Sequence, residues 1–149
     1  AIELKPDHLN AYVNRGVAYN DKKDREKAIA DYTKAIEIDP AQHQSYYNRA
    51  VAYTAMQKFE QALPDLNKFI EAGTATPEGL SDAYLNRGIV QYYAGDVDKA
   101  IADMTKAIEL NPKQVNAYRG RAMLYREQNK NDLADVDEKR ADEISKGRP

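Results

Sequence analysis

Apolar and small residues recur along this chain at helical spacing, in segments separated by short polar turns. In the first segment, Tyr12, Gly16 and Tyr19 follow one another at intervals of four and three residues, which places them on one side of a helix. Asp24 then stands where a helix N-cap is expected. The next segment carries apolar or small residues at the same spacing, at Ala28, Ile29, Tyr32, Ala35 and Ile36. The pattern predicts two amphipathic helices joined by a tight turn.

The same pattern occurs four times. The stretches "AYVNRGVAY", "SYYNRAVAY", "AYLNRGIVQ" and "AYRGRAMLY" begin at Ala11, Ser45, Ala83 and Ala117, so their starts are 34, 38 and 34 residues apart. The periodicity predicts helices near 9–22, 25–38, 43–56, 59–72, 80–94, 97–110, 115–128 and 131–145. One such helix pair cannot bury its apolar face alone, so successive pairs should stack on one another.

This repeat resembles the tetratricopeptide repeat (TPR), and the resemblance covers essentially the whole chain. The shared positions are aromatic at Tyr12, Tyr46, Tyr84 and Tyr118, small at Gly16, Ala50, Gly88 and Ala122, alanine at Ala28, Ala62, Ala100 and Ala134, and proline at Pro40 and Pro112. The resemblance implies an all-α fold, a right-handed superhelical solenoid of antiparallel helix pairs.

We expect a single TPR domain over residues 1–149. Its parts are the end of a truncated earlier repeat (1–8), repeat 1 (9–42), repeat 2 (43–76), an insertion (77–80), repeat 3 (81–114), and repeat 4 with a C-terminal cap (115–149). The insertion belongs to the stretch "GTATPEGL" (73–80), which we interpret as a longer turn, either a local hinge or a tolerated surface loop.

The two ends of the chain differ in character. The opening "AIELKP" repeats the phrases "AIEIDP" and "AIELNP" that close two copies, so we expect the chain to begin inside an earlier repeat. Ile2 and Leu4 would then lack their packing partners, and we expect association of copies through this end at high concentration; the alternative is simple fraying. Near the other end, Asp135, Glu138 and Asp142 replace apolar residues of the earlier copies, as a terminal cap facing water requires.

Composition excludes several classes of function. The 22 Lys and Arg residues are balanced by 24 Asp and Glu, for a net charge of -2, so we expect neither nucleic-acid binding nor membrane insertion. There is no cysteine, and His8 and His43 lie apart at turns between repeats, which argues against a metal site. No glycine-rich phosphate loop occurs, and we expect no cofactor and no enzymatic activity. We expect a soluble protein whose compartment stays open, with the cytoplasm favoured.

An arginine in each copy is followed by an aspartate 16 residues later. The pairs are Arg15 and Asp31, Arg49 and Asp65, Arg87 and Asp103, and Arg121 and Asp137. In an antiparallel helix pair this separation brings the two residues onto facing helices. We therefore predict partly buried, bidentate ion pairs that set the register of the two helices.

The asparagines Asn14, Asn48 and Asn86 share one position of the repeat, which Gly120 occupies in the fourth copy. In the TPR architecture this position faces the concave side, and it resembles the asparagine ladder of the O-GlcNAc transferase superhelix, whose amides bind a peptide backbone. The alternative is that asparagine at this position is a sequence preference of this repeat subtype without a role in binding. Neighbouring positions of the expected groove hold Val13, Val17, Tyr47, Val51, Leu85, Ile89, Tyr92, Arg119, Met123 and Arg126.

A second known TPR site, the Lys–Asn–Arg clamp of co-chaperones for a C-terminal carboxylate, is not matched. Its positions hold Val13, Val17, Asn48, Asp82 and Asn86 here, and Asp82 would repel a carboxylate. Two functions remain. The first is a scaffold that binds an extended peptide segment of a partner protein in the groove, and the second is a structural or self-association element of a longer TPR protein.

Overall fold

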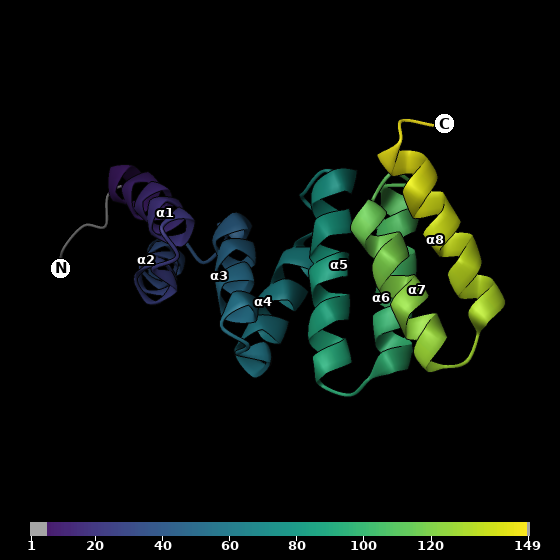
Figure 1. Ribbon diagram of the computed structural model, residues 1–149. Helices are drawn as coiled ribbons and strands as arrows, with labels where there is room; N and C mark the ends of the chain where they lie inside the picture. The colour runs from purple at the N-terminus through teal and green to yellow at the C-terminus, as the bar shows by residue number, and fades with distance from the viewer. Residues whose placement is uncertain (1–5, 149) are drawn as a thin grey trace. The chain divides into compact units, whose positions relative to one another are not determined.

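The computed structural model describes residues 6–148, which form eight α-helices and no strand (Figure 1). The helices are α1 (Pro6–Asp21), α2 (Arg25–Ile38), α3 (His43–Ala55), α4 (Phe59–Ala72), α5 (Pro77–Tyr93), α6 (Val97–Leu110), α7 (Val115–Glu127) and α8 (Asn131–Ser145). The all-α fold expected from the periodicity is confirmed. None of the helices in this range has the length and apolar character needed to cross a membrane.

The predicted helix boundaries agree with the structure to within three residues, and the differences have local causes. The Asp24 carboxylate caps α2 by accepting a hydrogen bond from the backbone N–H of Lys27, as expected. The stretch 77–80, expected to lie in a longer turn, is instead the first turn of α5. Thr76 caps this helix through its hydroxyl oxygen, 3.1 Å from the backbone nitrogen of Gly79, and Pro77 occupies the first helical position. The inserted residues therefore lengthen a helix.

The chain divides into two compact units, residues 1–72 and 73–149. In unit 1, α1 packs on α2 and α3 on α4, and α2 joins the two pairs by packing on α3. In unit 2, α5 packs on α6, α7 on α8, and α6 on α7 in the same way. The single domain expected from the sequence stays a prediction, and each unit is described by itself below.

Small side chains make up most of the core, and this allows the helices to approach closely. Ala28, Ala62, Ala100 and Ala134, the alanines shared by the four copies, have no exposed surface. At Gly16, even a Cβ atom would lie 2.7 Å from Cε1 of Tyr32, whose ring is buried at 2% exposure. The glycine therefore leaves room for a large ring on the facing helix, and burial raises the pKa of Tyr32 to about 12.

The turn inside each helix pair contains one residue with left-handed backbone conformation. These residues are Lys23 (φ 63°), Gln57 (φ 58°), Gly95 (φ 87°) and Asn129 (φ 58°). In each turn the next residue donates its backbone N–H to a carbonyl five residues earlier, for example Lys58 to Tyr53 at 2.9 Å. This geometry closes the first helix of the pair with the hydrogen bonds of a Schellman motif. Of these four residues only Gly95, in the third copy, is a glycine, the residue type that adopts this backbone conformation most readily.

We predict that exchanging residues between these equivalent turns changes stability in opposite directions. Gln57→Gly should raise the free energy of unfolding by about 0.5–1 kcal/mol, because glycine adopts positive φ without steric cost. Gly95→Gln should lower it by a similar amount, about 0.5–1 kcal/mol, for the same reason. Urea unfolding followed by far-ultraviolet circular dichroism measures both changes. The explanation fails if the two variants shift stability in the same direction.

Candidate functional site

The four arginine–aspartate pairs expected from the 16-residue spacing are present, and each joins the two helices of a pair by two hydrogen bonds. The arginine Nε lies 2.7–2.8 Å from the aspartate Oδ2, and Nη2 lies 2.7–2.8 Å from Oδ1. This is the bidentate geometry that a guanidinium group favours with a carboxylate. The hydrogen bond to Asp65 is the largest cause of the raised pKa of Arg49, and the bond to Asp137 has the same effect on Arg121.

The pairs differ in how far the arginine is exposed. The aspartate side chains are 4–9% exposed in all four. The side chains of Arg49, Arg87 and Arg121 are 16–20% exposed, whereas that of Arg15 is 57% exposed. Tyrosine rings flank the guanidinium groups; Cζ of Arg49, for example, lies 5.9 Å from the ring centres of both Tyr46 and Tyr53.

A further hydrogen bond, which we did not expect, ties Arg49 and Arg121 each to the preceding helix pair. Nη1 of Arg49 donates to the hydroxyl of Thr33 on α2 at 3.1 Å, and Nη1 of Arg121 donates to the hydroxyl of Thr105 on α6 at 3.0 Å. The threonine precedes its arginine by 16 residues, the same spacing that separates the arginine from its aspartate. One guanidinium group therefore links three consecutive helices within a unit.

We predict that removing the aspartate costs more where the remaining arginine is largely buried than where it is exposed. Asp65→Ala leaves Arg49 without its carboxylate in a largely buried position, and should lower the free energy of unfolding by about 3–5 kcal/mol. Asp31→Ala is the matched control within the same unit. It should cost about half as much or less, because the exposed Arg15 can be hydrated. Denaturant unfolding measures both, and equal losses would contradict the explanation by burial.

The asparagines of the candidate ladder lie on α1, α3 and α5 and differ in their hydrogen bonds. The side chain of Asn14 is exposed and makes no hydrogen bond to any residue that the structure describes. The Oδ1 of Asn48 accepts a hydrogen bond from Nε2 of Gln44 at 3.0 Å, and Nδ2 of Asn86 donates to the backbone oxygen of Asp82 at 2.8 Å. Asn14 and Asn48 belong to unit 1 and Asn86 to unit 2, so only the first two are placed relative to each other.

We call the side chains that α1 and α3 present beside these asparagines the α1–α3 surface: Val13, Asn14, Val17, Tyr47, Asn48 and Val51. The six residues belong to one surface because α1 and α3 contact each other within unit 1. All six are neutral. Val17 is 41% exposed, and the others except Asn14 are half-buried. The ring of Tyr47 is packed against that of Phe69, with their centres 5.0 Å apart. The surface offers amide groups and apolar side chains together.

The corresponding positions of unit 2 differ from the expectation at Leu85. This residue was expected to line the groove, but it is only 9% exposed and belongs to the hydrophobic core of unit 2. Ile89 and Tyr92 pack against the same core and are half-buried, whereas Met123 remains 45% exposed. Helical periodicity assigned Leu85 to the right face of α5, but other helices of the unit cover that part of the face.

Gly120, which stands at the asparagine position of the fourth copy, has a packing role. A Cβ atom at this residue would lie 2.8 Å from Sδ and 2.9 Å from Cε of Met104 on α6. Any larger residue would require the buried end of Met104 to move. Gly120 therefore leaves room for the thioether end of Met104.

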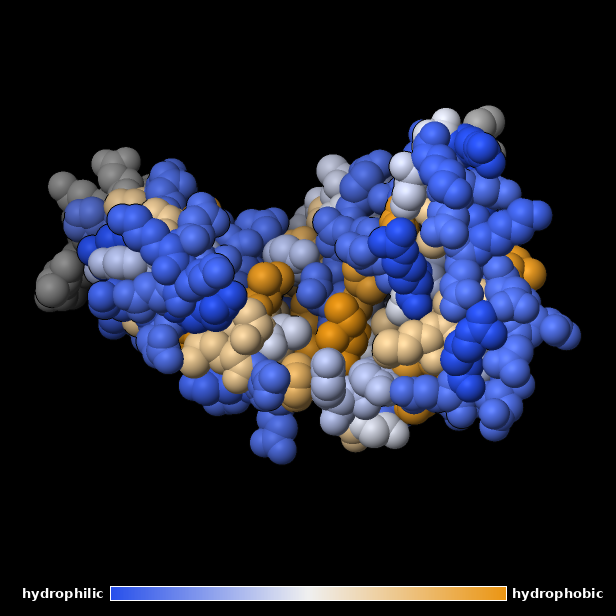
Figure 2. All heavy atoms as spheres, viewed as in Figure 1, coloured by the Kyte–Doolittle hydropathy of each residue, from blue (hydrophilic) through white to orange (hydrophobic). Residues whose placement is uncertain are grey.

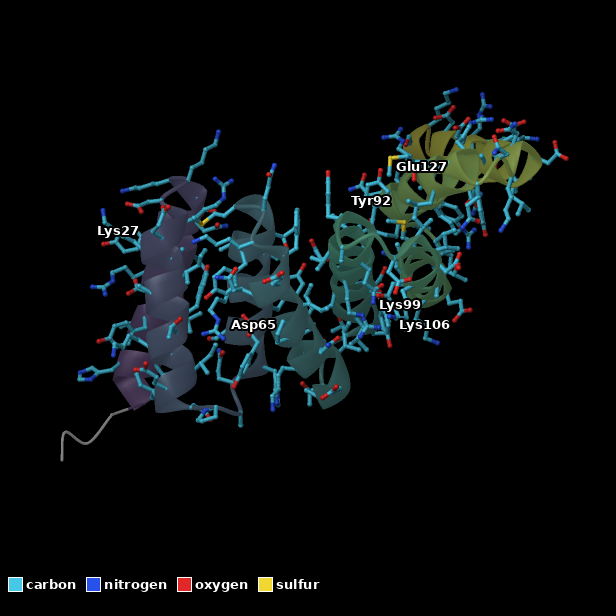
Figure 3. All side chains as sticks on the ribbon, turned by 90° about the horizontal axis from the view of Figure 1, so that it is seen from below. Lys27, Asp65, Tyr92, Lys99, Lys106 and Glu127 are labelled. Atoms are coloured by element: carbon cyan, nitrogen blue, oxygen red, sulfur yellow. The ribbon has the colours of Figure 1, made fainter. Side chains whose placement is uncertain are left out.

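The arginines expected at the C-terminal end of the groove are held by carboxylates of α8. Nη2 of Arg126 lies 2.6 Å from Oδ1 of Asp135 and 2.8 Å from Oε2 of Glu138. Nη2 of Arg119 lies 4.0 Å from Oδ1 of Asp142. The expected positive charge is therefore compensated within unit 2. Nearby, Tyr92 donates a hydrogen bond to Glu127 at 2.7 Å, which raises the pKa of Tyr92 (Figure 3).

The expectation for the N-terminal end concerns Ile2 and Leu4, which lie outside the described residues. Close to that end, α1 presents a hollow lined by His8, Ala11, Tyr12 and Arg15. The described residues contain no cluster of three or more His, Asp or Glu placed to hold a metal ion.

Comparison with known proteins identifies the fold. A family model described as "Tetratricopeptide repeat" matches residues 9–42, and a second with the same description matches residues 42–113. A comparison with curated protein sequences gave no match. The structure titled "Crystal structure of MamA" is 25% identical, with a TM-score of 0.86 over 96% of this chain and 81% of that chain.

Two further solved structures have the same fold at lower identity. MamA 41-end from Desulfovibrio magneticus RS-1 is 18% identical, with a TM-score of 0.84 over 93% of this chain and 76% of that chain. The first TPR of Spaghetti (RPAP3), bound to the HSP90 peptide SRMEEVD, is 23% identical, with a TM-score of 0.76 over 86% of this chain and 98% of that chain. The TPR solenoid class expected from the repeat is thereby confirmed.

Proposed function

Since the chain belongs to the tetratricopeptide repeat family, we propose that it is a non-catalytic scaffold for protein–protein interaction that binds an extended peptide segment of a partner. The observation that carries the proposal is the α1–α3 surface, on which Asn14 and Asn48 lie beside exposed or half-buried valines. A solved TPR structure of the same fold holds a peptide, and this supports a peptide as the kind of ligand.

The chemistry of this surface suits a peptide backbone. A carboxamide offers both a donor and an acceptor, as a peptide group does. Asn14 has both available among the described residues, while Asn48 already uses Oδ1 to accept from Gln44 and keeps Nδ2 as a donor. Val17, at 41% exposure, can cover an apolar side chain of the peptide. Amide groups would then hold the backbone, and the valines would select small apolar side chains.

In unit 2 we assign the corresponding role to Asn86, Ile89, Tyr92 and Met123, with Arg119 and Arg126 at the margin. Leu85 no longer belongs to the set because it is buried. The alternative function, a structural or self-association element, draws on the hollow on α1 that is lined by His8, Ala11, Tyr12 and Arg15. We retain it as the second candidate.

Isothermal titration calorimetry with a peptide library tests the asparagine ladder. We predict that the triple change Asn14→Ala, Asn48→Ala and Asn86→Ala lowers the affinity for the best-binding peptide by about tenfold or more, since each lost hydrogen bond contributes about 0.5–1.5 kcal/mol. Gln61→Ala, which removes an exposed amide of α4 away from the ladder, is the control and should leave binding unchanged.

The outcomes separate the two functions. Peptide binding that is insensitive to the triple change would reject the ladder and keep the scaffold. If no peptide binds while sedimentation shows self-association that Ala11→Glu, a change at an exposed residue of the α1 hollow, abolishes, the structural element is favoured instead.

A further inference from the structure

The α1–α3 surface stays neutral beyond the six residues that define it. Asn10 lies one turn before Asn14 on α1, and Gln44 and Thr54 lie one turn before and after the members of the surface on α3. Charged residues make up 31% of the chain, yet this side of the two helices carries none from Asn10 to Val17 or from Gln44 to Thr54. The row of neutral side chains thus extends over successive turns of both helices.

The side chains behind this surface are also uncharged. The fourth copy shows which positions of the second helix reach the exposed side of the first: Arg126 of α7 binds Asp135 and Glu138 of α8. Arg119 of α7 approaches Asp142 of α8 in the same way. Charge at these positions is compatible with the fold, and hydrophilic residues cover most of the visible surface of α8 (Figure 2). The corresponding positions of unit 1 are apolar or aromatic: Ile29, Tyr32 and Ile36 on α2, and Leu63, Leu66 and Ile70 on α4.

The charged residues of α1 and α3 lie on another side or at the ends of these helices. Arg15 and Arg49 stand two residues away from apolar members of the surface, which places them on the other side of each helix, where aspartates of the facing helices bind them. Asp21 lies one turn beyond Val17, and His43 is the first residue of α3. Among the described residues of α1 and α3, none is therefore placed to pair with a charge at the centre of the surface.

A ligand at this surface meets hydrogen-bonding groups that carry no charge. Nε2 of Gln44 donates to Oδ1 of Asn48 at 3.0 Å, so Asn48 keeps Nδ2 as a donor and Gln44 keeps its side-chain oxygen as an acceptor. A peptide group can exchange its hydrogen bonds to water for bonds to these amides. A charged side chain would lose part of its hydration here and gain no opposite charge, which is unfavourable.

We propose that the α1–α3 surface selects an uncharged segment of the partner protein and discriminates against acidic and basic segments alike. The amides bind the backbone of the segment, and the valines contact its apolar side chains. This inference rests on the proposed function, because it names the class of peptide that the scaffold binds. Such a ligand differs from the peptide SRMEEVD in the RPAP3 structure, in which three of the seven residues are acidic. Since no ion pair forms, binding should also be insensitive to ionic strength.

Three labelled peptides with blocked ends test the proposal. They have equal length and valine at every second position, and the remaining positions are all serine, all lysine or all glutamate. At about 150 mM salt, where long-range attraction is largely screened, fluorescence anisotropy with the full chain should show the serine peptide binding about tenfold more tightly than either charged peptide. The affinity for the serine peptide should change by less than about twofold between about 50 mM and 500 mM salt.

A charge introduced into the surface provides the reverse test. Val17→Lys places a cation at a position that is 41% exposed, and should raise the affinity for the glutamate peptide by about tenfold while lowering the affinity for the lysine peptide. Val17→Gln introduces a polar side chain without the charge and should keep the order of the three peptides. Ala30→Lys adds the same charge at an exposed residue of α2 outside the surface, and should keep the order as well. Circular dichroism verifies that all three variants are folded.

The outcomes separate this inference from the proposed function. A preference for either charged peptide, equal binding of all three, or a strong effect of salt on the serine peptide overturns the inference and leaves the scaffold in place. An equal response of the glutamate peptide to Val17→Lys and Ala30→Lys overturns it too. If none of the three peptides binds, the best ligand of the peptide library decides: an uncharged one supports the inference, and a charged one contradicts it. If the library also contains no ligand, the proposed function fails and the inference fails with it.

Discussion

The burial of one carboxylate in each helix pair is the constraint on which the rest of the structure depends. As whole residues, Asp31, Asp65, Asp103 and Asp137 are only 3–6% exposed, and a carboxylate removed from water is costly unless a cation and hydrogen-bond donors compensate it. The arginine of the facing helix supplies both through two parallel hydrogen bonds. A shift of one helix along the other would separate the two groups, so the pair sets the register of the helices more than it adds net stability.

Close packing follows from this register. Helices held at a fixed offset present the same positions to each other in every copy, and small residues at these positions bring the backbones together. The size of one residue then determines the size allowed opposite it: Gly16 leaves room for Tyr32, and Gly120 for Met104. Thr33 and Thr105 extend the same network to the next pair, because each binds the remaining nitrogen of an arginine.

Features that repeat with a fixed spacing could be predicted from the sequence. The helix boundaries and the arginine–aspartate pairs follow from periods of 3.6 and 16 residues, and the threonine contact, which we missed, shows the same 16-residue signal between Thr33 and Arg49. Features that depend on what covers a face could not be predicted in this way. Periodicity assigns Leu85 and Arg126 to a face of a helix, but it does not show that Leu85 joins the core or that Arg126 reaches Glu138 on α8. The start of α5 at Pro77 was missed because the extra residues were interpreted as a turn, although Thr76 followed by Pro77 is a typical helix start.

Pairing within a repeat and stacking between repeats are therefore separate properties of the sequence, and α8 shows that one can change without the other. It keeps the buried Asp137, at 3% exposure, and with it the bond to Arg121 that holds α7 and α8 together. Its three positions that are apolar in earlier copies carry carboxylates instead, and these remain exposed. Such substitutions are tolerated because they lie outside the buried pair and can be hydrated or bonded to Arg119 and Arg126. A repeat of this kind can thus acquire a new surface chemistry without losing its fold, since the residues that hold each helix pair together are separate from those on its exposed side.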